Sequence, residues 1–262
     1  MLISIIIPTK NEKENISKLL DTLVIQEQPI EIIVVDANSK DGTQEIVRKY
    51  TQTYPNIKLY VKDGNIGESL NYGIKKAVGK AISFIGADDR ADKDWIKNIR
   101  IALNKNHKIV AGKCILKGKK EFELDRIKLY YKGTDVSIPG TNTTYKKEIL
   151  QELGGFDPHF VTAEDIDLNL RAVDAGYKIY FEKKAIVYRY SRENIVDFIK
   201  QAFRNGYGRK QLVLKHGKLW KSYSIQEIIK TQFTIFGILR LIFGIFGYLS
   251  CGLTSKRTTP EQ

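Results

Sequence analysis

The chain has few cysteines, and its first 35 residues contain no glycine. The chain has only two cysteines, Cys114 and Cys251, with no metal-type spacing, so nothing indicates a disulfide framework or a zinc site. No glycine lies between Met1 and Val35, whereas a dinucleotide-binding Rossmann domain would carry G-x-G-x-x-G after its first strand. The P-loop signature is also absent. Any bound nucleotide is therefore held by another arrangement.

The first residues are not expected to form a signal peptide. The apolar run 2–7 stops at Pro8, and it is too short and lacks the flanks of a signal peptide. Together with the low cysteine content, this predicts a reducing, cytoplasmic location.

Composition is that of a globular protein with a basic end. Hydrophobic residues make up 42% and charged residues 28% of the 262 residues, which favours one large domain with an appendage. The net charge is +13, which favours anionic partners. Much of the excess lies in residues 200–262, where there are eleven Lys and Arg but only two acidic residues, Glu227 and Glu261.

Apolar runs rich in β-branched residues alternate with helical patterns over the first hundred residues. The expected strands are 3–7, 30–35, 57–61 and 81–85, and the expected helices are 13–26, 42–50, 68–77 and 94–103. This spacing predicts right-handed βαβ units, hence an α/β fold with a mainly parallel twisted sheet and helices on both faces. After residue 113 the pattern weakens, and 114–138 is left unassigned. A loop and strand at 139–145 and helices at 146–153 and 164–175 are expected beyond it.

In parallel sheets, ligands bind beyond the carboxyl ends of the strands. Those ends here are polar, acidic and rich in turn formers: 8–12, 36–42 and 86–89. The alternative is that Asp, Asn and Gly only form turns and helix caps there. Three such loops together favour a binding site.

Six short motifs occur in a recognisable order. They are 4–12 (SIIIPTKNE), 34–43 (VVD to DGT), 65–73 (NIG to NYG), 87–89 (ADD), 154–157 (GGFD) and 164–168 (EDIDL). In this order the chain resembles the family 2 glycosyltransferases of the GT-A fold over roughly residues 2–190. Each motif alone is weak, but six in order are specific.

The resemblance implies a role for particular residues. The donor nucleotide sugar, UDP- or GDP-linked, is expected to lie against a set of nine: Pro8, Thr9, Asn11, Glu12, Asp36, Asn38, Gly67, Asp88 and Arg189. Within it Asp36 would accept a hydrogen bond from the base. Asp165 matches the catalytic base, and Asp88 with Asp89 would hold Mg²⁺ or Mn²⁺ against the diphosphate. The acceptor side would comprise Thr141, Asn142, Glu164 and Arg204.

The chemistry asks for the same residue types. A nucleoside diphosphate leaves with developing negative charge, which a divalent cation on oxygen ligands neutralises. The acceptor hydroxyl needs a carboxylate within hydrogen-bond reach to take its proton. One base with a metal-held leaving group supports a single displacement with inversion, and nothing calls for the paired carboxylates of a glycoside hydrolase.

The chain departs from the family pattern at two positions. Gly86 stands where the first aspartate of D-x-D is expected, and Arg189 stands where many relatives carry a histidine. A guanidinium is always charged and binds phosphate in a bidentate manner. We therefore hypothesise weakened metal dependence; the alternative is that Arg189 is a surface residue and metal binding is ordinary.

The C-terminal segment combines apolar and basic character. Gln201 and Arg204 match the Q-x-x-R part of the motif of processive relatives, but Asn205 replaces its tryptophan, so processive synthesis is not supported. Segment 233–253 has Arg240 as its only charge and as a helix would be roughly 31 Å long, enough to cross a membrane.

Small and polar residues recur along this segment at helical spacing, at 234, 237, 240, 244, 247, 251 and 254. This stripe fits an in-plane amphipathic helix, a spanning helix packed through its glycines, or a helix docked on the protein's own core. Basic and aromatic residues flank it: Arg209, Lys210, Lys215, Lys218, Trp220, Lys221, Tyr223, Lys230, Lys256 and Arg257. They favour an anionic membrane surface, and no nucleic-acid recognition motif accompanies them.

The sequence thus predicts a GT-A catalytic domain at 1–190 and a helical, membrane-associating tail at 191–262. The predicted activity is inverting sugar transfer from a nucleoside-diphosphate sugar to a lipid-linked or polysaccharide hydroxyl at the cytoplasmic side of the membrane. One alternative is a non-catalytic subunit that binds sugar nucleotides at the membrane. The other is a nucleotidyltransferase, which the absence of a Gly- and Arg-rich phosphate loop disfavours.

Overall fold

The computed structural model describes residues 1–117, 124, 126–190, 194–217, 219, 223, 229 and 232–255. It divides into two compact units. The first comprises 1–116, 139–158 and 171–190, and the second comprises 117–138, 159–170 and 191–262. The predicted residues 191, 218, 220, 221, 230, 256 and 257 lie outside the described residues, as does part of 114–138.

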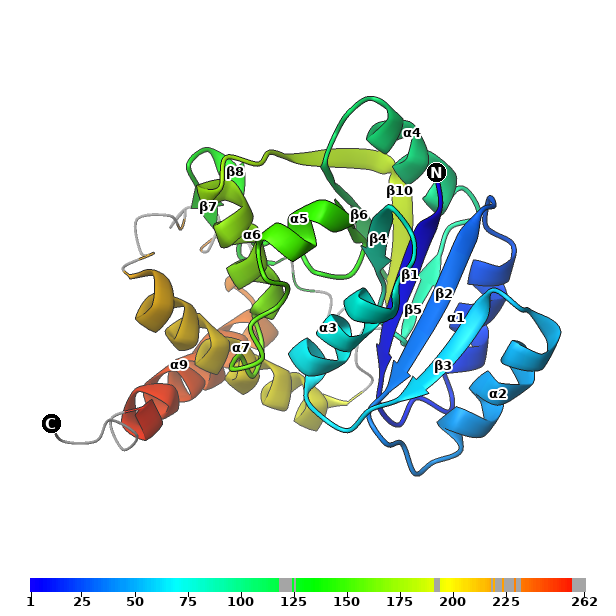
Figure 1. Cartoon of the computed structure of the whole chain (residues 1–262). Helices are drawn as coiled ribbons and strands as arrows, with labels where there is room; N and C mark the ends of the chain where they lie inside the picture. Colours follow the sequence, from blue (N-terminus) through cyan, green and yellow to red (C-terminus); the bar gives the residue numbers. More distant parts are fainter. Residues whose placement is uncertain are drawn as a thin grey trace, which may run out of the picture. The chain divides into compact units, whose positions relative to one another are not determined.

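The first unit begins with the alternation that the sequence predicts (Figure 1). Its elements are β1 (Ile3–Thr9), α1 (Ile16–Val24), β2 (Ile30–Asp36), α2 (Thr43–Thr53), β3 (Ile57–Val61), α3 (Ile66–Lys76), β4 (Ala81–Phe84), β5 (Asp89–Ala91) and α4 (Trp95–Asn104). Strands β3, β2, β1 and β4 lie side by side and pair in parallel. The predicted α/β class is confirmed.

The remaining strands of the sheet alter its second half. They are β6 (Ile109–Lys117), β9 (Thr143–Lys146) and β10 (Ile179–Tyr190), and the full order is β3-β2-β1-β4-β9-β6-β10-β5. The pairs β4–β9, β9–β6 and β10–β5 are antiparallel. Thus β6 and β10, which the sequence pattern did not predict, extend the sheet by antiparallel pairing.

Alternate residues of β1 explain why helices cover both faces of this sheet. Ile3, Ile5 and Ile7 join the core cluster with residues of α1, α2 and α4. Ile6 points the other way and lies against Gly73 of α3, where a Cβ atom would meet the Ile6 side chain at 2.6 Å. Because successive side chains of a strand point to opposite faces, β1 is buried on both sides, and the one polar side chain of this run, Ser4, donates to Glu31 Oε2 at 2.7 Å.

The second unit contains the N-terminal part of α6 (Glu164–Asp174), the short hairpin β7 (Tyr130–Tyr131) and β8 (Thr134–Asp135), and the helices α7 (Ile195–His216) and α9 (Ile235–Ser255). The helix α5 (Lys147–Glu152) belongs to the first unit. The predicted helices at 146–153, 164–175 and 233–253 are thus present, with ends shifted by up to two residues.

Candidate functional site

Two loops at the carboxyl ends of β1 and β2 are locked together by hydrogen bonds. The backbone N–H of Asn11 donates to Ser39 Oγ at 2.8 Å, and Lys40 N–H donates to Asn11 Oδ1 at 3.0 Å. Asn11 and Asn38 have positive φ angles of 55° and 60°, which asparagine tolerates better than most residues. The predicted donor residues of these loops are therefore brought together on one rigid rim.

Pro8 and Thr9 stand directly beside the second strand. Their Cα partners in the β1–β2 register are Val35 and Asp36. The N–H of Glu12 donates to Thr43 Oγ1 at 2.9 Å, so the start of α2 also holds the first loop. The sequence prediction named four of these positions but missed Thr43, whose signal is its place directly after Asp41 and Gly42.

Asp36 is fully buried and its carboxylate is already occupied by the loop. Its Oδ1 accepts from Ser39 N–H and Gln44 Nε2, both at 2.8 Å, and its Oδ2 accepts from Ser39 Oγ at 2.6 Å. A base that contacts Asp36 must share these acceptors. Ser39 and Gln44 are functional candidates that the sequence prediction missed.

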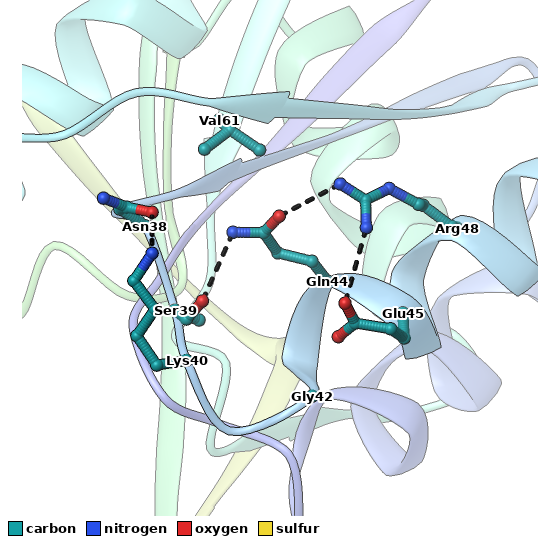
Figure 2. Close-up of a pocket in the computed structure, with 8 residues that line it drawn as sticks. All are labelled: Asn38, Ser39, Lys40, Gly42, Gln44, Glu45, Arg48 and Val61. Atoms are coloured by element: carbon teal, nitrogen blue, oxygen red, sulfur yellow. Dashed lines mark hydrogen bonds and ion pairs between the residues drawn. The ribbon is translucent and has the colours of Figure 1, made fainter.

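A hollow of about 530 Å³ opens beside this loop (Figure 2). Its lining comprises Asn38, Ser39, Lys40, Gly42, Gln44, Glu45, Arg48 and Val61. Arg48 donates to Gln44 Oε1 at 3.1 Å and pairs with Glu45 at 3.6 Å, as Figure 2 shows. The hollow is polar at its loop and capped by one apolar residue, which suits a planar polar group.

Gly67 owes its identity to a close backbone approach. A Cβ atom there would lie 3.2 Å from Pro158 Cα and 3.4 Å from Asp157 O. Nearby, Asn71 Nδ2 donates to Phe156 O at 2.7 Å, and Phe156 N–H donates to Asn71 Oδ1 at 2.8 Å. The third and fifth sequence motifs are thus docked on each other, with Asn71 as the bridge.

The acidic pair after β4 faces Arg189. Asp89 is 1% exposed, and its Oδ2 accepts from Thr141 Oγ1 at 2.5 Å and from Gly86 N–H at 3.2 Å. Arg189 is its partner in the β10–β5 register, with Nε 3.4 Å from Asp89 Oδ1. Asp88 is exposed. The structure therefore brings the three predicted charged residues and Thr141 into one cluster.

Burial raises the pKa of Asp89 to about 6, and the neighbouring Asp88 charge adds to the effect while Arg189 opposes it. A Cβ atom on Gly86 would lie 2.8 Å from Asp88 Oδ1 and 3.0 Å from Asp89 Oδ2. The space that a first aspartate would need is thus taken by the other two carboxylates.

The acidic pair fits a divalent cation in part. Asp89 Oδ1 is buried and accepts no hydrogen bond from any described residue, and Asp88 offers a second carboxylate at the surface. No group of three or more His, Cys, Asp or Glu side chains suited to a metal ion is found among the described residues. A cation here would therefore need further oxygen ligands, which a diphosphate can supply.

Asn142 lies in the core, with its side chain fully engaged. Its Oδ1 accepts from Trp95 Nε1 at 2.7 Å, and its Nδ2 donates to Lys113 O and Ala185 O at 3.1 and 3.0 Å. It is 1% exposed with φ of 62°. This geometry favours a structural role over the predicted acceptor contact, which stays a prediction.

In the second unit, Glu164 and Asp165 begin α6. Asp165 is half-buried and its Oδ1 accepts from Ile166 N–H at 2.8 Å. Burial raises the pKa of Glu164 to about 7, and the Asp165 charge adds to this while Arg204 of α7 opposes it. The predicted acceptor-side residues Glu164 and Arg204 are thus electrostatic neighbours of the predicted base.

Glu164→Gln is expected to change the pH dependence of stability. The folded pKa of about 7 exceeds the unfolded value near 4.5, so the folded state holds a proton that the unfolded state releases, and stability falls as pH rises through this window. Relative to wild type, the variant should gain roughly 1 to 3 kcal/mol between pH 5 and pH 8. Urea unfolding at both pH values measures this. Glu45→Gln, at an exposed site, is the control; equal pH slopes for all three proteins would contradict the buried carboxyl.

Asp167 anchors this end of α6 to α7. It is fully buried, and its Oδ1 lies 2.8 Å from both Lys215 Nζ and His216 Nε2. In addition, Gln211 of α7 donates to His159 O at 2.7 Å. These contacts hold the helix end that carries the predicted base against α7. The sequence analysis identified the acidic motif at 164–168 but predicted none of these contacts.

Comparison with known proteins agrees with the fold and the motif order. The model of glycosyl transferase family 2 matches residues 4–163, and that of glycosyl transferase family group 2 matches residues 124–254. The glycosyltransferase AglE of Haloferax volcanii is 27% identical over 229 residues, which are 80% of this chain and 73% of AglE.

Two further proteins are similar to this chain, one in sequence and one in fold. A Methanococcus voltae enzyme named dolichyl N-acetyl-alpha-D-glucosaminyl phosphate 3-beta-D-2,3-diacetamido-2,3-dideoxy-beta-D-glucuronosyltransferase is 28% identical over 242 residues, 82% of this chain and 74% of its own. The mannosyltransferase PcManGT of Pyrobaculum calidifontis, solved with GDP-Man and Mn²⁺, superposes with a TM-score of 0.66 at 18% identity, covering 99% of this chain and 76% of that one. The predicted GT-A fold is thereby confirmed. Since the first family model covers more than half of its residues, the chain belongs to glycosyl transferase family 2, as its motif order predicted.

Proposed function

We propose that this glycosyltransferase moves a sugar, with inversion, from a UDP- or GDP-linked donor to a hydroxyl of a lipid-linked or glycan acceptor at the cytoplasmic face of a membrane. The observation that carries the donor half is the cluster of Asp88, Asp89 and Arg189 beyond β4. It offers both a cation site and a fixed positive charge for a diphosphate.

In the proposed donor site, the carboxylates and the guanidinium have different roles. Asp88 and Asp89 would hold the divalent cation, which when bound neutralises charge on the leaving diphosphate. Arg189, held opposite Asp89 by the β10–β5 register, supplies positive charge that needs no metal. The rim of Asn11, Ser39 and Asp36 would hold the nucleoside.

Asp165 is the proposed base. It accepts the proton of the acceptor hydroxyl as the oxygen forms a bond to the anomeric carbon, and the bond from that carbon to the diphosphate oxygen breaks. One displacement inverts the anomeric configuration. The raised pKa of Glu164, about 7, means that this carboxyl retains a proton in about half of the molecules at neutral pH, which lowers the negative charge beside Asp165.

The acceptor class is supported by what surrounds α6. Its base-bearing end is anchored to α7, and α7 packs along the apolar α9. The Methanococcus voltae relative is named for a dolichyl phosphate acceptor, which is a lipid. These two observations support a lipid-linked acceptor for this chain.

Calorimetric titration with UDP, GDP and their sugar conjugates, with and without Mn²⁺, tests the donor site. We expect one nucleotide family to bind, and Asp88→Ala to weaken its binding in Mn²⁺ by roughly tenfold or more. Absence of binding by every nucleotide would contradict the proposal. Donor binding without transfer to any acceptor would instead favour the non-catalytic subunit, which Gly86 in place of the first aspartate also favours.

Arg189→Ala is expected to weaken metal-free donor binding by roughly tenfold, because the charge that neutralises the diphosphate is lost. The same titration in EDTA measures it. Lys183→Ala, an exposed position on the same strand, should bind like wild type. If Arg189→Ala binds normally in EDTA while EDTA abolishes wild-type activity, metal dependence is ordinary and Arg189 is not a phosphate anchor.

A further inference from the structure

Helices α7 and α9 run side by side in the same direction. Near their starts, the rings of Phe198 and Phe236 lie 5.9 Å apart. Further along, Lys210 Nζ lies 5.0 Å from the centroid of the Tyr248 ring. Both contacts join positions at similar distances from the helix starts, so the two helices begin on the same side of the pair, and their ribbons cross at an angle (Figure 1).

Glycines let the two backbones touch. A Cβ atom on Gly206 would overlap the carbonyl of Gly244, and one on Gly247 would overlap the carbonyl of Phe203. Gly244 and Gly247 belong to the stripe of small residues that the sequence shows at helical spacing in segment 233–253. Close small-residue packing fixes the register of two helices, so α9 cannot tilt far from α7.

α7 is too polar to enter a hydrocarbon core. Its 22 residues include five Lys and Arg, at 200, 204, 209, 210 and 215, against one Asp at 197. Each basic residue costs about 2.5 to 3.5 kcal/mol at the centre of a bilayer. If α9 crossed the membrane in this pairing, the middle of α7, which touches α9 at Gly206 and Phe203, would have to enter the hydrocarbon core, and the charges of α7 oppose that.

The face of α9 turned away from α7 is apolar throughout. Its exposed side chains run from 43% exposed at Ile242 to 77% at Ile235: Ile235, Ile238, Ile242, Ile245, Phe246, Leu249 and Leu253. Their spacing of three and four places them on one stripe. Arg240, the single charge of α9, is off this stripe, and its Nε donates to Gln232 Oε1 at 2.7 Å.

We propose that the α7–α9 pair lies in the plane of an anionic bilayer surface, with the α9 stripe inserted among the upper acyl chains and no segment of the pair crossing. This inference rests on the membrane location given in the proposed function, and it specifies that the chain binds the membrane surface without crossing it. Although Ile235–Leu253 is long and apolar enough to span, its packing on α7 removes that option. Interfacial helices of this kind combine an apolar stripe with basic neighbours.

The basic residues of α7 favour an anionic bilayer, and not a second copy of the chain, as the surface that covers the apolar stripe of α9. Two copies meeting through α9 would bring two α7 helices together, each with five basic residues and one acidic residue. An anionic leaflet attracts the same charge, with about 1 kcal/mol for each Lys or Arg near the surface. The bilayer is therefore the complementary surface.

Depth-dependent fluorescence quenching distinguishes lying from crossing. Ile238, Ile245 and Leu253 are replaced one at a time by cysteine in a full-length Cys114→Ser background and labelled with bimane, while buried Cys251 stays unreactive. Vesicles of phosphatidylcholine and phosphatidylglycerol carry nitroxide at a shallow or a deep acyl position. We expect the shallow nitroxide to quench all three labels at least about twofold more than the deep one. Deep quenching at Ile245 with shallow quenching at both ends would show crossing and overturn the proposal.

A charge variant tests the stripe without removing buried contacts. Ile242→Asp with Phe246→Asp should lower partitioning into anionic vesicles by about tenfold or more, while Ile25→Asp with Val78→Asp, exposed apolar positions in the first unit, should change it less than about twofold. Equal partitioning of both double variants, or stripe-dependent dimers in place of vesicle binding, would overturn it. Neither assay uses a sugar donor, so a chain that transfers no sugar still reports its membrane mode, and a crossing helix would leave the transfer proposal standing.

Discussion

Asp165→Asn is expected to lower the rate of sugar transfer by roughly a hundredfold to ten thousandfold, because the amide cannot accept the proton of the attacking hydroxyl. Donor affinity should change little, since Asp165 is proposed to act on the acceptor hydroxyl and other residues are proposed to hold the donor. Transfer kinetics with radiolabelled donor and membrane lipid extract, alongside calorimetry for donor binding, separate the two effects.

The matched control for this variant is on the same helix. Asp174→Asn makes the same chemical change at an exposed position in the last turn of α6, and it should retain near wild-type transfer. If Asp165→Asn keeps full activity while Glu164→Gln loses it, the base is Glu164 and the assignment from the motif is wrong by one residue. Loss in both Asp variants would instead point to a folding defect of α6.

Asn142→Leu is expected to lower the free energy of unfolding by roughly 3 to 5 kcal/mol. Three hydrogen bonds disappear, which leaves the Trp95 indole N–H and the carbonyls of Lys113 and Ala185 buried without that partner. The positive φ of 62° adds strain for leucine. Urea unfolding monitored by tryptophan fluorescence measures the change.

Asn104→Leu is the control, because it makes the same substitution at the exposed end of α4 and should change stability by less than about 0.5 kcal/mol. A stable Asn142→Leu protein that binds donor normally but fails in transfer would contradict the structural role. That result would return Asn142 to the acceptor side, where the sequence prediction put it.

The first half of the sheet could be predicted because its strands are buried on both faces. Runs such as Ile3–Ile7 are apolar except for Ser4 and buried throughout, and this run is followed by a helix with its own apolar stripe. Strand β10 is different, since no residue at 179–184 is buried: Phe181, Lys183 and Lys184 are exposed, and the other three are half-buried. Its partners in the sheet are distant in sequence, so local pattern carried little information about it.

The sequence predicted which loops form the donor site, but it did not predict the hydrogen bonds within those loops. Asp36 and Asn11 stand at strand ends, where turn-forming polar residues signal a site. That Ser39 and Gln44 occupy the carboxylate of Asp36 follows from the loop conformation, and the positive φ of Asn38 is part of it. A one-dimensional pattern contains no such angle.

The sequence by itself determined the family, the α/β class and the identity of the charged residues, because motif order and hydrophobic period are local properties of the chain. Only the tertiary structure decided that Arg189 faces Asp89 across two antiparallel strands, that the Asn142 side chain forms hydrogen bonds within the core, and that α9 packs on α7 through glycine contacts. Each of these joins residues that are tens of positions apart, and such pairings depend on the closure of the whole fold rather than on any local preference.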